Sequence, residues 1–190
     1  GAGFIGTNLA IELLRLNNRV CIYDNFEEGL YSKKIKLKNV KCIEEFVNQL
    51  GDKTLLDVLN RDIMKLNILM STMVCYEIDF VIHLAGKAGV RPSIENPLDY
   101  FNVNVQGTAN VLEACRELKI KNIIVASSSS VYGNNKNVPF SEDDVADNPI
   151  SPYGTSKRMM ELLCESYAKN FNMNIICLLY TSDAADEEDS

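Results

Sequence analysis

Tyr153 and Lys157 are the residues whose types and spacing most directly indicate chemistry. They lie four positions apart in a stretch that predicts a helix, so both side chains project from one face. A free tyrosine has a pKa near ~10 and is a poor base at neutral pH. An ammonium about 4 Å away contributes about 4 kcal/mol at an effective dielectric of about 20, which would bring the pKa of Tyr153 to around 7. The pair therefore predicts a base that can take a proton from an alcohol.

A second Y-x-x-x-K match occurs at Tyr132 and Lys136, so the pattern alone is weak. The residues between them, Gly133-Asn134-Asn135, are typical of a turn, which does not hold a helical face. Tyr153 instead follows Pro152, a favourable first residue of a helix. An ordinary Tyr/Lys pair on a helix surface is the alternative, and it would be the better interpretation if the pair stood alone.

Four consecutive serines, at 127–130, follow the apolar run 122–126, which predicts a strand. Parallel α/β sheets bind ligands at the carboxyl ends of their strands. A serine hydroxyl there could hold the oxygen that Tyr153 deprotonates while the alcohol carbon gives hydride to a nicotinamide ring. A flexible polar turn is the alternative, but apolar sequence resumes at once with Val131 and Tyr132.

A glycine-rich turn, Gly1-Ala2-Gly3-Phe4-Ile5-Gly6, fits G-x-G-x-x-G and opens a predicted amphipathic helix. Glycines let the backbone approach a pyrophosphate, and the helix start offers N–H groups and a positive dipole end. Asp24 lies 18 residues past Gly6, at the end of the next predicted strand. Its carboxylate could bind the adenosine ribose diol and repel a 2′-phosphate, which favours NAD over NADP. A glycine-rich helix start beside an ordinary turn aspartate is the alternative.

Alternating strands and helices must position these residues. Apolar runs predict strands at 20–23, 55–59, 79–84, 122–126 and from 174, and a helical stretch before 79. Further helices are predicted at about 5–16, 97–118 and 151–170, the first with its apolar stripe at Ile5, Leu9, Leu13 and Leu16. Residues 26–54 are charged, and we expect a surface loop with short helical pieces. Because the strands are continuous apolar runs, the pattern predicts the α/β class, with helices on both faces of a parallel sheet.

Composition excludes several classes of protein. The 190 residues fit one domain, and 46% hydrophobic residues can fill a core. The net charge of -7 argues against nucleic-acid binding, and no apolar run approaches the ~18 residues of a membrane helix. The six cysteines form no CxxC pair, so we expect no metal site but free, buried thiols of a reducing compartment. His83, the only histidine, lies in an apolar run and is expected to be a satisfied core residue.

Seven segments together resemble the extended short-chain dehydrogenases/reductases, also called NAD-dependent epimerases/dehydratases. The resemblance implies a Rossmann-type doubly wound parallel sheet that holds NAD tightly. The segments lie in the family's order and spacing across residues 1–176: GAGFIG at 1–6, Asp24-Asn25, Asp62-Ile63, HLAG at 83–86, NVQGT at 104–108, SSSSVYG at 127–133 and SPYGTSK at 151–157.

The resemblance implies roles for residues at the matching positions. Ser128, Tyr153 and Lys157 correspond to the catalytic residues. The implied NAD-binding residues are Gly3, Phe4, Ile5 and Gly6 at the pyrophosphate, Asp24 and Asn25 at the ribose, Asp62 and Ile63 at the adenine, Leu84, Ala85 and Gly86 on the path to the nicotinamide, and Asn104, Tyr153 and Lys157 around the reacting centre.

The implied reaction is an epimerisation. The family's dehydratases carry an Asp-Glu acid pair just after the catalytic Ser/Thr, whereas this chain has Ser129 and Ser130, which are not acids at neutral pH. Residues 88–97 and ASSSSVYG are most similar to UDP-glucuronate 4-epimerases, which form UDP-galacturonate by transient oxidation at C4. In that reading Arg91 meets the carboxylate or diphosphate of the UDP-sugar, and Ser129 and Ser130 face the sugar. A surface ion pair is the alternative for Arg91.

Two other functions stay open at this point. UDP-glucose 4-epimerase is the alternative within the class, and a catalytically silent NAD-binding sensor or scaffold is the alternative from another class. We expect a cytoplasmic homodimer paired through the helices after Asn104 and Tyr153, although a targeting or membrane segment before residue 1 is not excluded.

Both ends depart from the family pattern. The family's first strand lies before residue 1, and its substrate-binding domain follows about Ile176. We therefore expect residues 1–176 to be an incomplete NAD-binding domain of a longer enzyme, poorly folded and inactive by itself. Residues 177–190 resemble a translated sequencing adapter and are expected to be non-native; a natural disordered acidic tail is the alternative. Five of the acidic residues lie in 181–190, so the remainder is nearly neutral.

Overall fold

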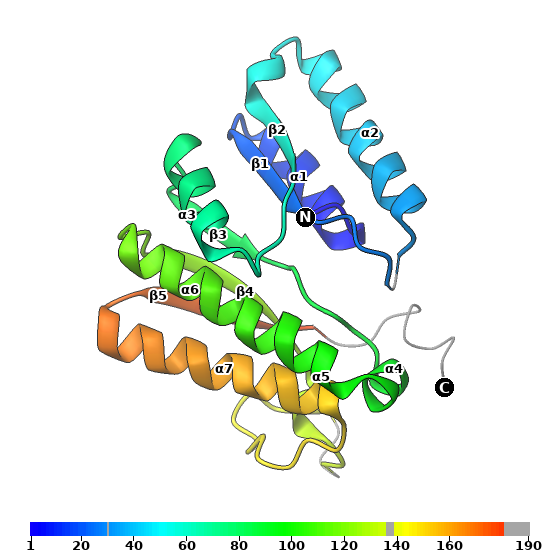
Figure 1. The fold of residues 1–190 in the computed structure, drawn as a ribbon, viewed down its shortest axis with the longest axis vertical. Coiled ribbons are helices and arrows are strands. Elements are labelled where there is room, and N and C mark those ends of the chain that lie inside the picture. The colour runs from blue at the N-terminus through cyan, green and yellow to red at the C-terminus, as the bar shows by residue number, and fades with distance from the viewer. Residues whose placement is uncertain (30, 136–138, 181–190) are drawn as a thin grey trace.

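The computed structural model describes residues 1–29, 31–135 and 139–180, in which strands and helices alternate (Figure 1). The strands are β1 (Val20–Asp24), β2 (Leu56–Asn60), β3 (Phe80–His83), β4 (Asn122–Ser128) and β5 (Asn174–Tyr180). The helices are α1 (Phe4–Arg15), α2 (Lys33–Leu50), α3 (Leu66–Cys75), α4 (Val90–Glu95), α5 (Pro97–Tyr100), α6 (Gly107–Glu117) and α7 (Pro152–Phe171). Three short helical turns complete the set: η1 (Lys53–Leu55), the π-helical η2 (Phe101–Gln106) and η3 (Ser129–Tyr132).

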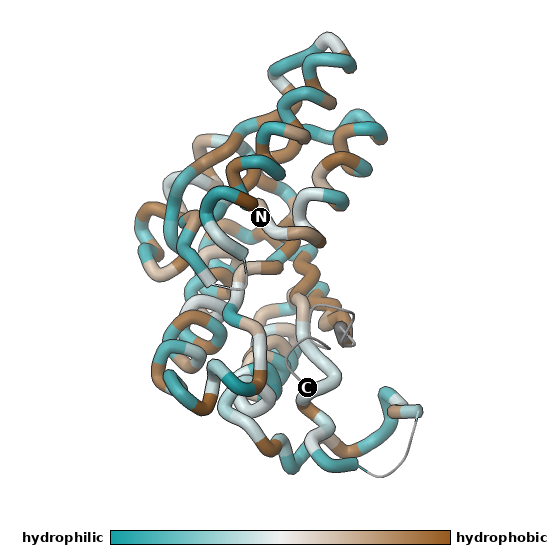
Figure 2. Tube along the Cα trace, turned by 90° about the vertical axis from the view of Figure 1, so that its right-hand side faces the viewer, coloured by the Kyte–Doolittle hydropathy of each residue, from teal (hydrophilic) through white to brown (hydrophobic). Residues whose placement is uncertain are grey.

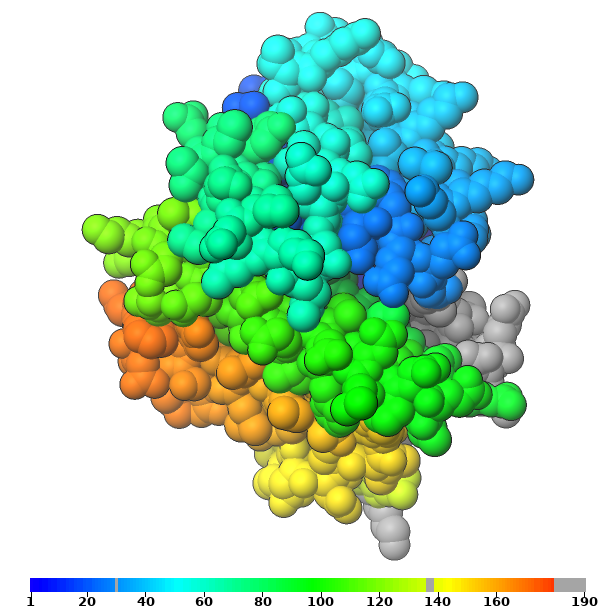
Figure 3. Space-filling view, viewed as in Figure 1, coloured from blue at the N-terminus to red at the C-terminus, as the bar shows by residue number. Residues whose placement is uncertain are grey.

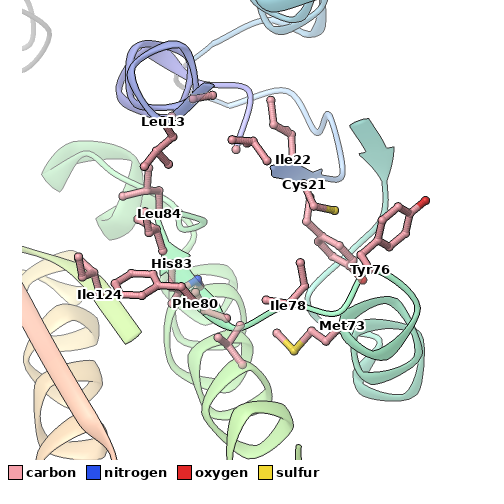
Figure 4. A pocket seen from close by; sticks show the side chains of 18 of the residues that line it. Leu13, Cys21, Ile22, Met73, Tyr76, Ile78, Phe80, His83, Leu84 and Ile124 are labelled. Atoms are coloured by element: carbon pink, nitrogen blue, oxygen red, sulfur yellow. The ribbon is translucent and has the colours of Figure 1, made fainter. Parts of the chain in front are cut away.

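Every strand pair is parallel, which confirms the predicted α/β class. β1 pairs with β2 from Val20↔Leu56 onward, and β4 lies between β3 and β5. Helix α1 lies on one side of the strands and α3 and α6 lie on the other, as expected for a doubly wound sheet (Figure 4). Parallel strands need such covering helices because both faces of the sheet are apolar.

An open groove separates the two-stranded sheet from the three-stranded one (Figure 4). It has a volume of about 890 Å³ and is lined by both β1 and β3, through residues such as Ile22 and Phe80. Gly1 lies against β1, since a Cβ atom on Gly1 would come within 2.7 Å of the Ile22 side chain. The groove therefore lies between β1 and β3, with Gly1 beside it, and no strand of the described residues pairs the two sheets across it.

The groove also explains a difference from the predicted packing of α1. Two residues of the predicted apolar stripe, Leu9 and Leu13, line the groove, and Leu16 at its end is 73% exposed. The residues of α1 that are buried are Thr7, Ala10 and Leu14. The apolar stripe thus faces a position that no described strand covers.

The expectation of a loop at residues 26–54 is wrong, because α2 fills most of it. Ser32 caps the helix by accepting a hydrogen bond from the Ile35 N–H, and Gly51 ends it with a φ of 79°. Val40, Ile43 and Val47 are buried at helical spacing. Hydrophobic and hydrophilic positions alternate along the helical turns in Figure 2, as amphipathic helices require.

The apolar core is divided along the groove. One cluster lies between α1, α2 and β1 and includes Leu14, Ile22 and Ile43. A larger cluster lies among α3, α6, α7 and the three-stranded sheet and includes Leu112 and Met160. Residues 139–150, yellow in Figure 3, cover the end of the molecule at which α7 begins.

His83 is a satisfied core residue, as predicted. Its side chain is buried, and Nε2 lies 2.9 Å from the hydroxyl oxygen of Thr108. Burial, followed by the nearby charge of Lys157, lowers the pKa of His83 to about 3, so the ring is neutral.

The cysteines are free, but the expectation that they are all buried is wrong. Cys115 and Cys164 are buried, Cys21 and Cys177 are partly exposed, and Cys42 and Cys75 are exposed. Among the described residues, no group of three or more His, Cys, Asp or Glu side chains could hold a metal ion, and no helix has the length and apolarity to cross a membrane.

Strand β5 continues beyond the predicted end of the family-like region. Residues 177–180 pair in register with β4, so they extend the sheet past Ile176. The rest of the predicted tail, residues 181–190, lies outside the described part of the chain.

Candidate active site

A cleft of about 540 Å³ opens at the carboxyl ends of the parallel strands. Asp24 at the end of β1, Asp62 after β2, Leu84 after β3 and Ala126 in β4 all line it. Ligands bind in this position in open α/β sheets because the loops that follow the strands converge there.

The glycine turn forms one wall of the cleft and leads into α1. Gly3 caps the helix, and the first N–H groups of a helix have no partner within it. A Cβ atom on Gly6 would lie 2.1 Å from the Gly1 carbonyl oxygen, so only glycine fits there. The close turn and the positive end of the helix can therefore receive an anionic group such as a pyrophosphate.

Asp24 is a charged carboxylate held by four donors. Oδ2 accepts from the Gly1 amino group at 3.0 Å and from the Ala2 N–H at 2.9 Å. Oδ1 accepts from the Phe26 N–H at 2.8 Å and from Lys36 Nζ at 3.1 Å. Burial alone would raise the pKa of Asp24, but the Gly1 ammonium and the N–H bonds outweigh it and hold the pKa well below its usual range. Sequence reasoning missed Lys36 because it lies in the helix that was expected to be a loop.

Helix α7 begins as predicted and carries the Tyr/Lys pair. Ser151 caps it by accepting from the Gly154 N–H at 3.0 Å, and Pro152 is its first residue. Tyr153 is buried with its ring edge-on to Tyr100, the two centroids 6.1 Å apart. The structure therefore favours a buried pair over the alternative of a surface pair.

Lys157 is buried against the end of β4. Its Nζ donates to the Ala126 carbonyl oxygen at 2.9 Å. Burial lowers the pKa of Lys157 to about 8, and the negative charge of Glu161 and then that of Cys177 act against this shift. The side chain thus stays largely protonated at neutral pH, although a buried ammonium is costly.

Replacing Lys157 by Met is expected to remove this cost. A lysine whose pKa is about 8 when folded and 10.5 otherwise destabilises the fold fully below pH 8, and the penalty disappears as the pH rises through that interval. The free energy of unfolding should therefore rise by up to about 3 kcal/mol more in wild type than in Lys157→Met between pH 8 and 10.5. Urea unfolding of both chains measures the difference, and parallel pH dependences would contradict the prediction.

The serines form a defined strand end, not a flexible turn. β4 ends at the buried Ser128, whose hydroxyl accepts from the Ser130 N–H at 3.2 Å and donates to the Ser130 hydroxyl at 3.2 Å. Ser129 and Ser130 are half-buried in η3. The predicted serine therefore lies at the edge of the sheet on which the cleft opens.

Asn104 joins the loop after β3 to α7. Its Oδ1 accepts from the Lys87 N–H at 2.7 Å, and its Nδ2 donates to the Lys87 carbonyl at 3.0 Å and to the Ser156 hydroxyl at 2.9 Å. A Cβ atom on Gly86 would lie 3.0 Å from Asn104 Oδ1 and 3.4 Å from Lys157 Nζ. Gly86, Asn104 and Lys157 therefore lie close together. Ser156, which bonds Asn104, is a residue of this group that the sequence did not indicate.

The structure brings ten of the predicted residues together along the cleft, whereas others, which include the predicted catalytic residues, are not among the residues that line it: Asn104, Ser128, Ser129, Ser130, Tyr153 and Lys157. Arg91 is exposed on α4 and is not among the residues that line the cleft, and Phe4 is 59% exposed outside it. Tyr132 of the second Y-x-x-x-K match lies in η3, while Lys136 is outside the described residues. The predicted residues that line the cleft are Gly3, Ile5, Gly6, Asp24, Asn25, Asp62, Ile63, Leu84, Ala85 and Gly86.

These features define a dinucleotide-binding α/β domain of the Rossmann type. The chain belongs to the NAD dependent epimerase/dehydratase family, whose model matches residues 1–184.

Similar proteins carry related names. UDP-glucuronate 4-epimerase of Thermodesulfobacterium geofontis is 34% identical over 181 residues, which cover 94% of this chain and 53% of that protein. UDP-glucuronic acid 4-epimerase from Bacillus cereus, solved with UDP-glucuronic acid and NAD, is 33% identical with a TM-score of 0.74 over 94% of this chain and 54% of that one. UDP-glucose 4-epimerase from Brucella ovis, solved with NAD, is 31% identical with a TM-score of 0.79 over 95% and 50%. The chain thus spans about half the length of these relatives.

Proposed function

We propose that the protein is an NAD-dependent nucleotide-sugar 4-epimerase that converts UDP-glucuronate to UDP-galacturonate. The observation that carries the proposal is the meeting of α7, with Tyr153 and Lys157, and the end of β4, with Ser128, beside a cleft at the carboxyl ends of the strands. The family to which the chain belongs and the printed names of its relatives support the reaction class.

The residues of the cleft fit NAD. We assign the pyrophosphate to the turn at Gly3 and Gly6, and the adenosine ribose to the charged Asp24 with Asn25. Asp62 and Ile63 line the same cleft and would face the adenine, and 84–86 lead toward Lys157. The carboxylate of Asp24 disfavours a 2′-phosphate, which supports NAD rather than NADP.

The proposed chemistry uses one oxygen and one carbon of the sugar. Tyr153 takes the proton of the C4 hydroxyl, and Ser128 holds the same oxygen by a hydrogen bond. NAD bound in the cleft would supply the acceptor, and then the donor, of the hydride at C4. The Lys157 ammonium lowers the cost of negative charge on the Tyr153 oxygen. After the 4-keto sugar has rotated within the site, Tyr153 returns the proton to the C4 oxygen of the inverted centre.

Ser129, Ser130 and Arg91 bear on the choice of sugar. Ser129 and Ser130 lie in η3, beside Ser128, where a dehydratase would need acids, and neither hydroxyl can serve as one at neutral pH. We propose that these two serines face the sugar and that Arg91 on α4 meets the carboxylate or diphosphate. UDP-glucose remains the second candidate substrate, because a UDP-glucose 4-epimerase is among the similar structures.

Assays of the complete enzyme with both sugars test the proposal. We expect UDP-galacturonate to form from UDP-glucuronate with a kcat/KM at least about tenfold above that for UDP-glucose, a modest ratio for a site that recognises a carboxylate. Preference for UDP-glucose would establish the second candidate. Binding of NAD without turnover of either sugar would favour the silent sensor or scaffold. The homodimer paired through the helices after Asn104 and Tyr153 stays a proposal of the same kind.

A further inference from the structure

Lys36 is a cation in the cleft to which the proposed reaction assigns no role. It lies near the start of α2, lines the cleft, and has a side chain that is 16% exposed. The other lysines between 33 and 41 are exposed and do not line the cleft. Lys36 is therefore set apart from the solvent-facing charges of its helix.

The packing of α2 on the glycine turn fixes the position of Lys36. Asn39 donates from Nδ2 to the Ala2 carbonyl oxygen at 3.0 Å. Val40 packs in a buried cluster with Ala2 and Phe26. Because residues three and four positions apart share a helix face, the face of α2 that packs on the turn also carries Lys36.

The Lys36 ammonium bonds Asp24 and has further hydrogen-bonding capacity. Its Nζ donates to Asp24 Oδ1 at 3.1 Å, at the place where we assign the adenosine ribose. An ammonium has three donors, and the described part of the chain takes up one of them. The ion pair also offsets the negative charge of Asp24, which is the charge that would repel a 2′-phosphate.

Arg61 brings a second cation to the same end of the cleft. It follows Asn60, which pairs in register with Asp24, and its N–H donates to the Asp24 carbonyl oxygen at 3.0 Å. Arg61 lines the cleft, and within the described residues its guanidinium bonds a backbone carbonyl, that of Asn60, at 3.4 Å. Lys36 and Arg61 thus reach Asp24 from two different elements.

Acidic residues that line the cleft limit the effect of these cations. Glu27 and Asp99 both form ion pairs with Lys87. Glu28 and Asp62 also line the cleft, and neither has an ion partner among the described residues. A ligand with an added phosphate should therefore bind more weakly than one without it, but it should not be excluded.

We propose that Lys36 and Arg61 form a subsite for the 2′-phosphate of NADP, so that the cleft takes this dinucleotide as well as NAD. Ammonium and guanidinium groups both donate charge-assisted hydrogen bonds to phosphate oxygens. The inference rests on the proposed function only for the place of the ribose, and it does not depend on the reaction. The alternative is that Lys36 only ties α2 to the end of β1 through Asp24.

Titration calorimetry of the complete enzyme, freed of dinucleotide, with NAD and with NADP tests the subsite. In wild type we expect the Kd for NADP to exceed that for NAD by no more than about thirtyfold. Lys36→Met removes the ammonium and keeps a long side chain. It should raise the Kd for NADP by about tenfold or more and change the Kd for NAD by less than about threefold. Arg61→Met should act in the same direction.

Two further variants separate the subsite from a general effect of charge. Lys36→Arg keeps the cation and should retain most of the affinity for NADP. Lys41→Met is the matched control, because it removes the same charge from an exposed position of α2, where the ion partner is Glu45 at 3.9 Å. This control should leave both Kd values within about a factor of two, as for an exposed and screened charge.

No detectable binding of NADP to wild type would overturn the proposal. Equal weakening of both dinucleotides in Lys36→Met would do the same, in favour of the structural tie. The assays with the two sugars decide the proposed function separately. An enzyme that loses NADP selectively in Lys36→Met but epimerises neither sugar would retain the subsite and refute the proposed reaction.

Discussion

Tyr153→Phe in the complete enzyme is expected to lower kcat by about 10²–10⁴-fold while NAD remains bound. The substitution removes the hydroxyl that we assign to proton transfer from C4, and general-base catalysis contributes a factor of that size. The ring that packs edge-on against Tyr100 is retained, so the fold should be unaffected. Initial rates with UDP-glucuronate, together with the amount of NAD released on denaturation, measure both parts of the expectation.

Tyr132→Phe is the matched control. Tyr132 belongs to the other Y-x-x-x-K match and is also buried. It lies in η3, however, and its ring stacks on Phe140 in the loop that follows. We expect turnover within about a factor of three of wild type, as for a substitution outside the reacting centre. Near-normal turnover in Tyr153→Phe would show that the base has been assigned to the wrong residue.

Extending the chain before Gly1 by a short apolar strand is expected to raise the free energy of unfolding by up to about 3 kcal/mol. A Val/Ile-rich segment of about five residues, ending in glycine, would lie in the groove between β1 and β3 and pair with both edges. Each buried Val or Ile contributes about 2 kcal/mol, against about 1–2 kcal/mol per ordered residue for lost entropy. The extension also replaces the buried Gly1 ammonium, whose pKa is lowered by burial, with an uncharged amide.

Urea unfolding of the extended and original chains measures this gain. An extension of equal length made of Gly and Ser controls for added chain, since it offers backbone groups but no apolar surface. If the two extensions stabilise the chain equally, the groove does not take a strand, and the apolar lining around Leu13 and Ile22 has another cause.

The strands and the helices α1 and α7 were predictable because the sequence patterns that indicate them are local. The run at 122–126 and the Ser151-Pro152 start each lie within a few residues, and β4 and α7 confirm them. Helix α2 was missed because lysines between 33 and 41 hid a stripe of three buried residues. Ser32 and Gly51 are capping residues that could be recognised in the sequence, but the charged residues between them indicated a loop.

The polar contacts of the site could not be predicted in the same way. Asn104 bonds Ser156, and Ser127 bonds Glu161, across 52 and 34 positions of sequence. Such pairs depend on the register between a strand and a helix, which no local pattern specifies. The direction of the apolar stripe on α1 was likewise unpredictable, because it depends on the position of a neighbouring strand.

The division of the core has a consequence for cooperativity. Asp24 belongs to the part built on α1, α2 and β1, whereas Tyr153 and Lys157 belong to the part built on α7 and β4. Tyr23 of β1 packs against the larger cluster, so the two are joined there, but parts with distinct cores can still open locally with different unfolding free energies. A ligand long enough to contact both units would bind only when the units are correctly positioned relative to each other. Part of its binding free energy would therefore be used to hold the two units together. In such a domain the bound dinucleotide would hold the two units together as well as take part in the reaction.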